Sequence, residues 1–503
     1  MDNSTNKIDQ NNSFFGHPAG LKTLFLTEMW ERMSYYGMRA LLVLFMTATL
    51  QDGGMAINTA SAVAIYGLYT ASVYFMGLPG GWVADRLIGG QRAIWYGGII
   101  IMCGHLTLAI PNNNTFFIGL ILVAVGTGLL KPNISALVGQ LYQSDDQRRD
   151  SGYSIYYMGI NIGALIGYFI CGYLAENVGW HWAFGAAAIG MGLGLIQYQR
   201  TLSNLQGISE KPSVSMNDTS QKRSWQVIYL IGLAIIVITG LIMSNRLAIN
   251  PIVIAKYTAI AFTLLFFIYF AIIFFLGKLS ALEKKGMGAL LLVCIASACF
   301  WSGFEQAGST LNLFARDYTN LNVLGFAIPP AWFQSVNAIF IIILTPFFAA
   351  LWINIGRHMT SSAYAIKCAA GLIIMACGFI VMYFAAQIAA TGLKVAPFWL
   401  ILTYFLHTVG ELCLSPIALS AVSKLSPQRH LGQVMGIFIL TYSIGSIIAG
   451  LFAGNFDPDN VAEMPSLYLQ IVIFSVGVGA VILLLGFITK NWEREVEQQD
   501  FKQ

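Results

Sequence analysis

Residues 27–39 read TEMWERMSYYGMR and lie within the first long hydrophobic segment of the chain. An ionised group near the centre of a bilayer costs roughly 3 kcal/mol on insertion scales, so such groups normally face a bundle interior or an aqueous cavity. At about 100° per residue, six polar side chains of this run fall within an arc of roughly 140° on one helix: Glu28, Glu31, Arg32, Tyr35, Tyr36 and Arg39. A lone structural ion pair would use the same residue types, but two acids, two bases and two tyrosines on one stripe favour a functional site.

A second charged run, GELCLSP at 410–416, places Glu411 in a late apolar segment. The chain has 503 residues, of which 57% are hydrophobic and only 10% charged, and its mean hydropathy is +0.68. This composition is typical of an all-α polytopic membrane protein. A helical span needs about 20 mostly apolar residues, and fourteen segments qualify: 21–50, 58–84, 93–110, 115–141, 151–175, 181–199, 225–244, 252–277, 286–315, 328–354, 361–386, 395–424, 430–454 and 464–489.

The basic residues outside the spans predict how the chain is oriented. Of the 27 Lys and Arg residues, twenty fall on one set of tails and loops, four fall on the other, and Arg32, Arg39 and Lys131 lie inside spans. Because Lys and Arg accumulate on the cytoplasmic side, we expect both termini there and a multi-pass protein of the cell (inner) membrane. The net charge of +4 then reflects topology and gives no sign of nucleic-acid binding.

The polar stretch 201–224 separates six spans from eight. We therefore predict a cytoplasmic tail (1–20), an N-terminal six-helix bundle (21–200), a cytoplasmic linker (201–224), two inserted helices (225–285), a C-terminal six-helix bundle (286–490) and a second tail (491–503).

A weak internal repeat supports two parallel halves. A shift of 284 residues aligns Gly126 and Pro132 with Gly410 and Pro416, and a shift of 282 residues then aligns 162–166 with 444–448. Parallel halves around a substrate cavity define the major facilitator fold. The loop GWVADRLIGGQR at 81–92 resembles the cytoplasmic loop signature of that superfamily.

Four motifs resemble one family in particular, the proton-coupled oligopeptide transporters of bacterial type. They are EMWERMSYY (28–36), YYMGINIGAL (156–165), FWSGFEQ (300–306) and GELCLSP (410–416), and they occur in the family's order along the whole chain. Two departures concern side-chain selectivity: Tyr156 stands where the family usually has Phe, and Phe438 where a Trp is common.

The resemblance implies that Arg32 and Lys131 bind the substrate carboxylate and that Glu411 binds its amino terminus. Further residues implied to line the pocket are Tyr35, Tyr36, Tyr74, Asn161, Trp301, Asn337 and Ser415, and those implied in proton coupling are Glu28, Glu31 and Glu305. Arg39 and Glu305 are expected to pair as an outer gate, since each lies about 6–7 Å beyond the midpoint of its own span.

Physical chemistry supports the assignment of the two peptide ends to these residues. A dipeptide is a zwitterion whose ends lie within about 7 Å when extended, and the basic residues belong to the first half whereas Glu411 belongs to the second. The sequence thus predicts a proton-coupled symporter that imports di- and tripeptides by alternating access.

Other classes of function fit the sequence less well. A proton-driven carrier of a nitrate-like anion or a drug on the same fold is the alternative, because fold does not fix the ligand. We expect no enzyme, because the spans contain no catalytic motif, and no resident metal or cofactor, the proton gradient being the energy source. The expected partners are peptides, protons and the lipid bilayer, with no obligate protein partner.

Overall fold

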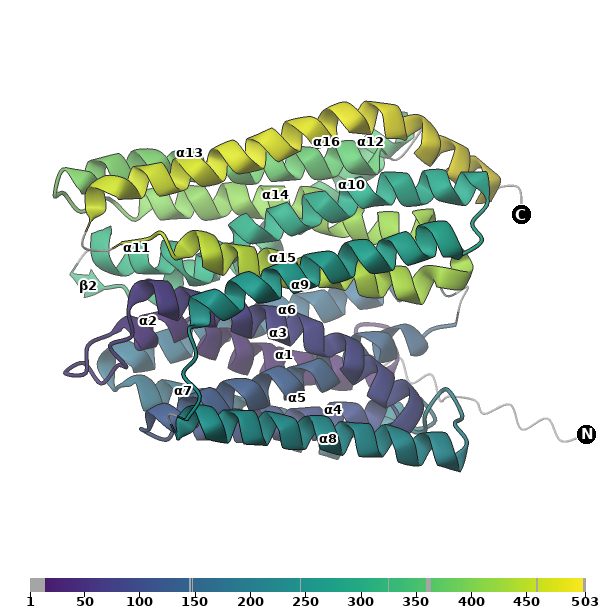
Figure 1. The fold of residues 1–503 in the computed structure, drawn as a ribbon, viewed down its shortest axis with the longest axis horizontal. Coiled ribbons are helices and arrows are strands. Elements are labelled where there is room, and N and C mark those ends of the chain that lie inside the picture. Colours follow the sequence, from purple (N-terminus) through teal and green to yellow (C-terminus); the bar gives the residue numbers. More distant parts are fainter. Residues whose placement is uncertain are drawn as a thin grey trace, which may run out of the picture. The chain divides into compact units, whose positions relative to one another are not determined.

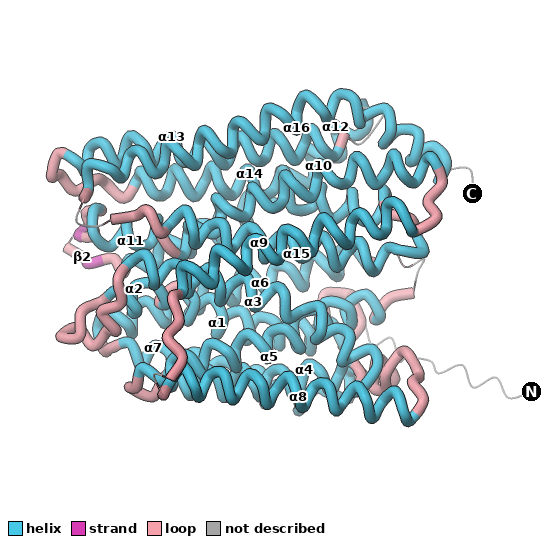
Figure 2. The backbone as a smooth tube through the Cα atoms, in the orientation of Figure 1, coloured by secondary structure: helices cyan, strands magenta, loops and turns pink. Residues whose placement is uncertain are grey.

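The computed structural model describes residues 14–143, 146, 148–244, 246–323, 325–358, 363–457 and 460–500. Its described part is almost entirely helical, with one short strand pair (Figures 1 and 2). Two compact units divide the chain: unit 1 holds 1–38 and 76–248, and unit 2 holds 39–75 and 249–503. The domain boundaries proposed from the sequence stay a prediction.

Unit 1 is built from helices that alternate in direction along the chain. They are α1 (Ala19–Arg39), the end of α3 (Thr59–Val83) with a π turn (Ala84–Ile88), α4 (Gly90–Leu108), α5 (Asn113–Gln140), α6 (Arg149–Asn177), α7 (Trp180–Thr201) with a 3-10 turn (Leu202–Leu205), and α8 (Asp218–Met243). Asn112 caps α5, its side chain accepting a hydrogen bond from the amide of Asn114 at 2.8 Å, which satisfies one of the free donors at a helix start.

Unit 2 contains the start of α3 and the remaining helices. These are α2 (Leu42–Thr47), α9 (Pro251–Ala271) with a π turn (Ile272–Leu276), α10 (Ala281–Phe304), a 3-10 turn (Glu305–Gly308), α11 (Thr310–Tyr318), a 3-10 turn (Pro330–Gln334), α12 (Ser335–His358), α13 (Tyr364–Ala390), α14 (Phe398–Leu425), a 3-10 turn (Gln428–His430), α15 (Leu431–Ala453), a 3-10 turn (Val461–Glu463) and α16 (Met464–Asp500). The strands β1 (Asn322–Val323) and β2 (Phe326–Ala327) pair antiparallel, with Val323 opposite Phe326.

Each of the fourteen predicted segments contains a helix, and eleven helices of the described chain are long and apolar enough to cross a membrane. The other three, α1, α4 and α7, are less apolar, α1 because of its charged stripe. The protein is thus an all-α polytopic membrane protein, as predicted.

The structure gives the internal repeat a physical meaning. A Cβ added at Gly126 of α5 would lie 2.7 Å from the carbonyl oxygen of Gly97 in α4, and one added at Gly410 of α14 would lie 2.7 Å from that of Gly371 in α13. The matched glycines therefore permit the same close backbone approach in each unit.

Two predicted spans are interrupted where the charges lie. The first, 21–50, ends as α1 at Arg39 and resumes as α2 at Leu42. The ninth, 286–315, breaks at Glu305, where a 3-10 turn separates α10 from α11. The predicted spans did not specify these breaks, because apolar periodicity does not register a short interruption. In addition, α16 runs on through the predicted tail to Asp500.

Candidate functional site

The charged stripe of α1 is buried within unit 1. Glu28, Glu31 and Arg32 are at most 1% exposed, and the Nε atom of Arg32 lies 3.2 Å from Glu28 Oε1 and also pairs with Glu31 Oε2. Within the described part of the chain, Arg32 Nη2 and Glu31 Oε1 have no hydrogen-bond partner. One guanidinium thus faces two carboxylates and still presents a free donor.

Aromatic rings and a second cation surround this stripe. The Arg32 guanidinium lies 5.1 Å from the ring centre of Tyr35 and 5.8 Å from that of Tyr36, distances typical of cation–π contacts. Half-buried Lys131 of α5 acts electrostatically on Glu31. The structure thereby brings together six of the residues that the sequence singled out on α1 and α5.

Helix α6 packs closely against α1 because its motif is rich in glycine. A Cβ at Gly163 would lie 2.2 Å from the Met29 carbonyl oxygen, so any side chain there would push α6 away from α1. Asn161, two residues closer to the start of α6, is buried and donates to the carbonyl of Tyr157 at 3.0 Å. The side-chain amide of Asn161 is thus engaged by its own helix, and its role in lining the substrate pocket stays a prediction.

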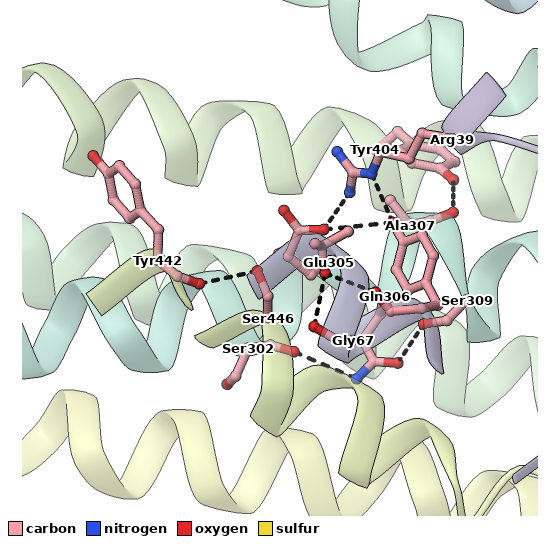
Figure 3. Close-up of polar contacts among 12 residues, drawn as sticks. Arg39, Gly67, Ser302, Glu305, Gln306, Ala307, Ser309, Tyr404, Tyr442 and Ser446 are labelled. Carbon is pink, nitrogen blue, oxygen red and sulfur yellow. Dashed lines mark hydrogen bonds and ion pairs between the residues drawn. The ribbon is translucent and has the colours of Figure 1, made fainter. Parts of the chain in front are cut away.

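The predicted gate pair forms within unit 2. Arg39 Nη2 pairs with Glu305 Oε2, and the Arg39 and Glu305 side chains are 7% and 1% exposed (Figure 3). Arg39 Nε also donates to the Tyr66 hydroxyl at 2.7 Å, and that hydroxyl donates to Glu305 Oε2 at 3.5 Å. Tyr66 is thus a third member of the pair that sequence reasoning missed.

The break after α10 holds Glu305 in place. Gln306 donates to the Ala449 carbonyl at 3.0 Å and accepts from the Thr310 hydroxyl at 2.8 Å. It also accepts from the Ser309 hydroxyl at 3.4 Å (Figure 3). A Cβ at Gly308 would lie 1.9 Å from the Tyr66 hydroxyl, so a glycine is required at this point.

Glu411 lies in a separate polar cluster of unit 2. Its Oε2 accepts from Asn337 Nδ2 at 3.1 Å, and the same nitrogen lies 2.9 Å from Thr408 Oγ1. No cation within the described residues forms an ion pair with Glu411. One turn further along α14, the Ser415 hydroxyl is buried without a hydrogen-bond partner among the described residues.

The remaining predicted residues of unit 2 meet in an aromatic cluster. The Tyr442 ring centre lies 4.9 Å from that of Trp301 and 5.6 Å from that of Tyr74, within the range of favourable aromatic pairs. Tyr442, like Tyr66, was not predicted. Each is an ordinary tyrosine in an apolar span, and its contacts come from residues far away in the sequence.

His17, a titratable residue outside the spans, makes contacts that hold the start of unit 1 in place. His17 Nδ1 hydrogen-bonds the Tyr142 hydroxyl at 2.9 Å, and Arg148 Nη1 donates to the Gly16 carbonyl at 3.0 Å. Burial, followed by the positive charge of Arg148, lowers the pKa of His17 from its ordinary value of 6.5. The segment from Phe14 to His17 thus depends on a neutral imidazole.

Buried charges in two helical units, with repeat-related close packing in each, define a secondary transporter of the major facilitator type. Comparison with known proteins agrees: the model of the POT family matches residues 91–465. The peptide transporter YePEPT of Yersinia enterocolitica is 41% identical over 96% of this chain and 97% of its own. A di-/tripeptide transporter of Lactococcus lactis subsp. cremoris is 36% identical over 87% of this chain and 89% of its own.

A crystal structure of a peptide transporter POT in complex with sulfate superposes with a TM-score of 0.89 at 36% identity, covering 96% of this chain and 97% of that one. The chain belongs to the POT family.

Proposed function

We propose that the protein is a proton-coupled symporter that imports di- and tripeptides by alternating access. One observation of the geometry carries the proposal: Arg32 is buried against two carboxylates and keeps a hydrogen-bond donor that no described residue satisfies. A planar guanidinium is the side chain best suited to bind a carboxylate. The relatives named as peptide and di-/tripeptide transporters supply the substrate class.

In unit 1, Arg32 and Lys131 take the peptide carboxylate. Tyr35, Tyr36 and Asn161 line this end of the substrate. The cation–π contacts of Arg32 with the two tyrosines hold its guanidinium on the stripe and exclude water from it. A charge-assisted hydrogen bond in such a dry site is roughly twice as strong as a neutral one.

In unit 2, Glu411 takes the peptide amino group. Among the described residues, the only hydrogen-bond partner of its carboxylate is the neutral amide of Asn337, so its negative charge is available to an ammonium. Trp301, Tyr74 and Ser415 line this end, where aromatic surface accepts many side chains.

Protons couple through Glu28 or Glu31. A buried carboxylate is held ionised by a nearby cation. When the peptide carboxylate engages Arg32 and Lys131, those cations compensate the glutamates less well, and one glutamate takes up a proton. Peptide and proton thus bind cooperatively, and the doubly loaded carrier reorients most easily.

Arg39 and Glu305 form the outer gate, which is shut when they are paired. Protonation of Glu305 releases Arg39 and favours opening. The protein resides in the cell (inner) membrane, with both termini in the cytoplasm, in accord with the excess of Lys and Arg on one set of loops.

The test is peptide-dependent proton entry into liposomes that contain the purified protein and a pH-sensitive dye. A dipeptide should acidify the lumen, and the Lys131→Ala variant should lose this response. The matched control is Lys256→Ala, which removes an exposed lysine from α9 and should behave like the wild type.

Exchange of labelled for unlabelled peptide separates binding from coupling. Glu31→Gln should retain exchange, which needs no net proton flow, while losing accumulation. Proton entry that responds to nitrate and not to peptides would instead support an anion carrier and contradict the proposal.

A further inference from the structure

Unit 1 has a groove that the transport site does not use. A cavity of about 440 Å³ opens at the start of α4 beside the end of α7. A second cavity, of about 580 Å³, continues along the same two helices. Trp95 and Gln199 line both cavities, so the two are adjacent, and we call them together the α4–α7 groove.

The inner part of the groove is apolar, and the whole groove has about the length of one membrane leaflet. Ile99, Met102, Leu195 and Gly192 line it. Ten residues of α4 separate Arg92 from Met102, a rise of about 15 Å, and the hydrocarbon core is about 30 Å thick. The space suits a hydrocarbon chain that enters from one side of the membrane.

Gly192 keeps this part of the groove open. A Cβ added there would meet only Met102 Sδ, at 3.5 Å, which is an ordinary contact. A larger side chain would therefore fill the groove without displacing the backbone of either helix. On the same helix, Ile189, Leu193 and Ile196 are exposed apolar residues, so this face of α7 is a lipid-facing surface.

The mouth of the groove is basic. Arg92 lines the first cavity and Arg200 the second, and neither makes an ion pair or hydrogen bond with another residue of the described part of the chain. Glu210 also lines the mouth, but its Oε1 accepts the Gly207 amide at 2.7 Å. Two guanidiniums against one carboxylate leave the mouth net positive.

The mouth is also firmly built. Gln91 Nε2 donates to the carbonyls of Leu205 and Ile208 at 2.6 and 2.7 Å, and the Tyr198 hydroxyl donates to the Gln91 carbonyl at 3.1 Å. These bonds fasten the chain after α7 to the start of α4. The basic mouth is thus a defined surface of the fold.

We propose that the α4–α7 groove binds one anionic glycerophospholipid, with an acyl chain along Ile99 and Gly192 and its phosphate at Arg92 and Arg200. Basic pockets between membrane helices recognise anionic head groups in this way. The apolar channel distinguishes this ligand from a soluble phosphate, because only a lipid fills both parts. The lipid belongs to the leaflet on the side that the charge bias predicts to be cytoplasmic.

Native mass spectrometry of the full-length protein in detergent tests the proposal, with phosphatidylglycerol and phosphatidylcholine as probes. Arg92→Gln with Arg200→Gln should weaken phosphatidylglycerol binding about 30-fold, since each cation at a membrane surface contributes a factor of about five. The matched control, Lys222→Gln with Arg223→Gln, removes two basic residues from α8. It should change phosphatidylglycerol binding by less than about two-fold.

A second pair of variants tests the apolar part separately. Gly192→Leu should weaken both lipids about ten-fold or more, the loss expected when a buried chain of a few methylenes is excluded. Gly185→Leu, on the same helix where only Ala109 Cβ lies near, at 3.9 Å, should leave binding unchanged.

Soluble competitors identify the source of the phosphate. Millimolar inorganic phosphate or glycerol 3-phosphate should fail to displace the lipid. Displacement by either, wild-type affinity in the double arginine variant, or an equal loss in the α8 control would each overturn the proposal.

Discussion

Replacing Glu305 with glutamine should open the proposed outer gate. The substitution keeps the shape of the side chain but removes the charge that faces the Arg39 guanidinium, which is 7% exposed. Removing one partner of a buried ion pair typically costs 3–5 kcal/mol. Arg39 would keep its hydrogen bond to the Tyr66 hydroxyl at 2.7 Å, so we expect a cost at the low end of this range, about 3 kcal/mol. This corresponds to a shift of roughly 150-fold in the equilibrium between the closed and open arrangements, toward the open one.

Distances between spin labels on the two outer helix ends measure this shift. Gln51, after α2, and Asn320, after α11, are exposed and suit labelling, on a background in which exposed Cys103 is replaced by alanine. The wild type should show mainly short distances, because Arg39 and Glu305 are paired. The Glu305→Gln variant should show long distances at every pH.

Two tyrosine variants calibrate the result. Tyr66→Phe removes a hydrogen bond to a charged group, worth about 1.5–3 kcal/mol, and should open the gate roughly 10- to 150-fold. Tyr404→Phe removes only a 3.5 Å contact with the Ala307 carbonyl and should have little effect. If the Glu305→Gln variant has the same open and closed populations as the wild type at every pH between about 5 and 8, the gate assignment should be dropped.

Three further predictions concern other parts of the molecule. Glu411→Gln should abolish uptake of unmodified dipeptides in a transport assay and should harm N-acetylated peptides less; normal dipeptide uptake would refute its role. Gly163→Ala should lower the melting temperature through a loss of about 1–3 kcal/mol, because its Cβ would lie 2.2 Å from a backbone oxygen, whereas Gly232→Ala, with nothing within 4 Å, should not. Because the pKa of His17 is lowered in the folded chain, attachment of Phe14–His17 should be complete above about pH 6.5 and weaken below it; hydrogen exchange of this segment should show the change in the wild type and none in His17→Gln.

The positions of the helices followed from the sequence because the apolar runs are long and the loops between them are polar. The charged stripe of α1 was equally clear, since six polar residues within thirteen positions are conspicuous in an apolar span. The internal repeat matched few residues in the sequence. Its glycines proved to share one packing role in each unit, which only backbone distances show.

Partners supplied by distant segments could not be predicted. Tyr66 meets Glu305 across 239 residues, and Asn337 meets Glu411 across 74. Nothing in the residues around Tyr66 separates it from Tyr69 as the partner of Arg39. Gly308 is visible in the sequence near the break at Glu305. The need for a glycine there comes from the Tyr66 hydroxyl, which only the structure shows.

The distribution of buried charge explains why peptide entry should require a proton. In unit 1, Glu28 and Glu31 face Arg32 and Lys131, so the cluster is close to neutral before substrate binds. A peptide carboxylate adds a third negative charge, and an uncompensated buried charge costs several kcal/mol. In unit 2, Glu411 has an amide but no described cation beside it, so the peptide ammonium neutralises a charge already present. The carboxylate end alone therefore calls for at least one proton, and peptides without a free carboxylate should be transported with weaker dependence on the proton gradient.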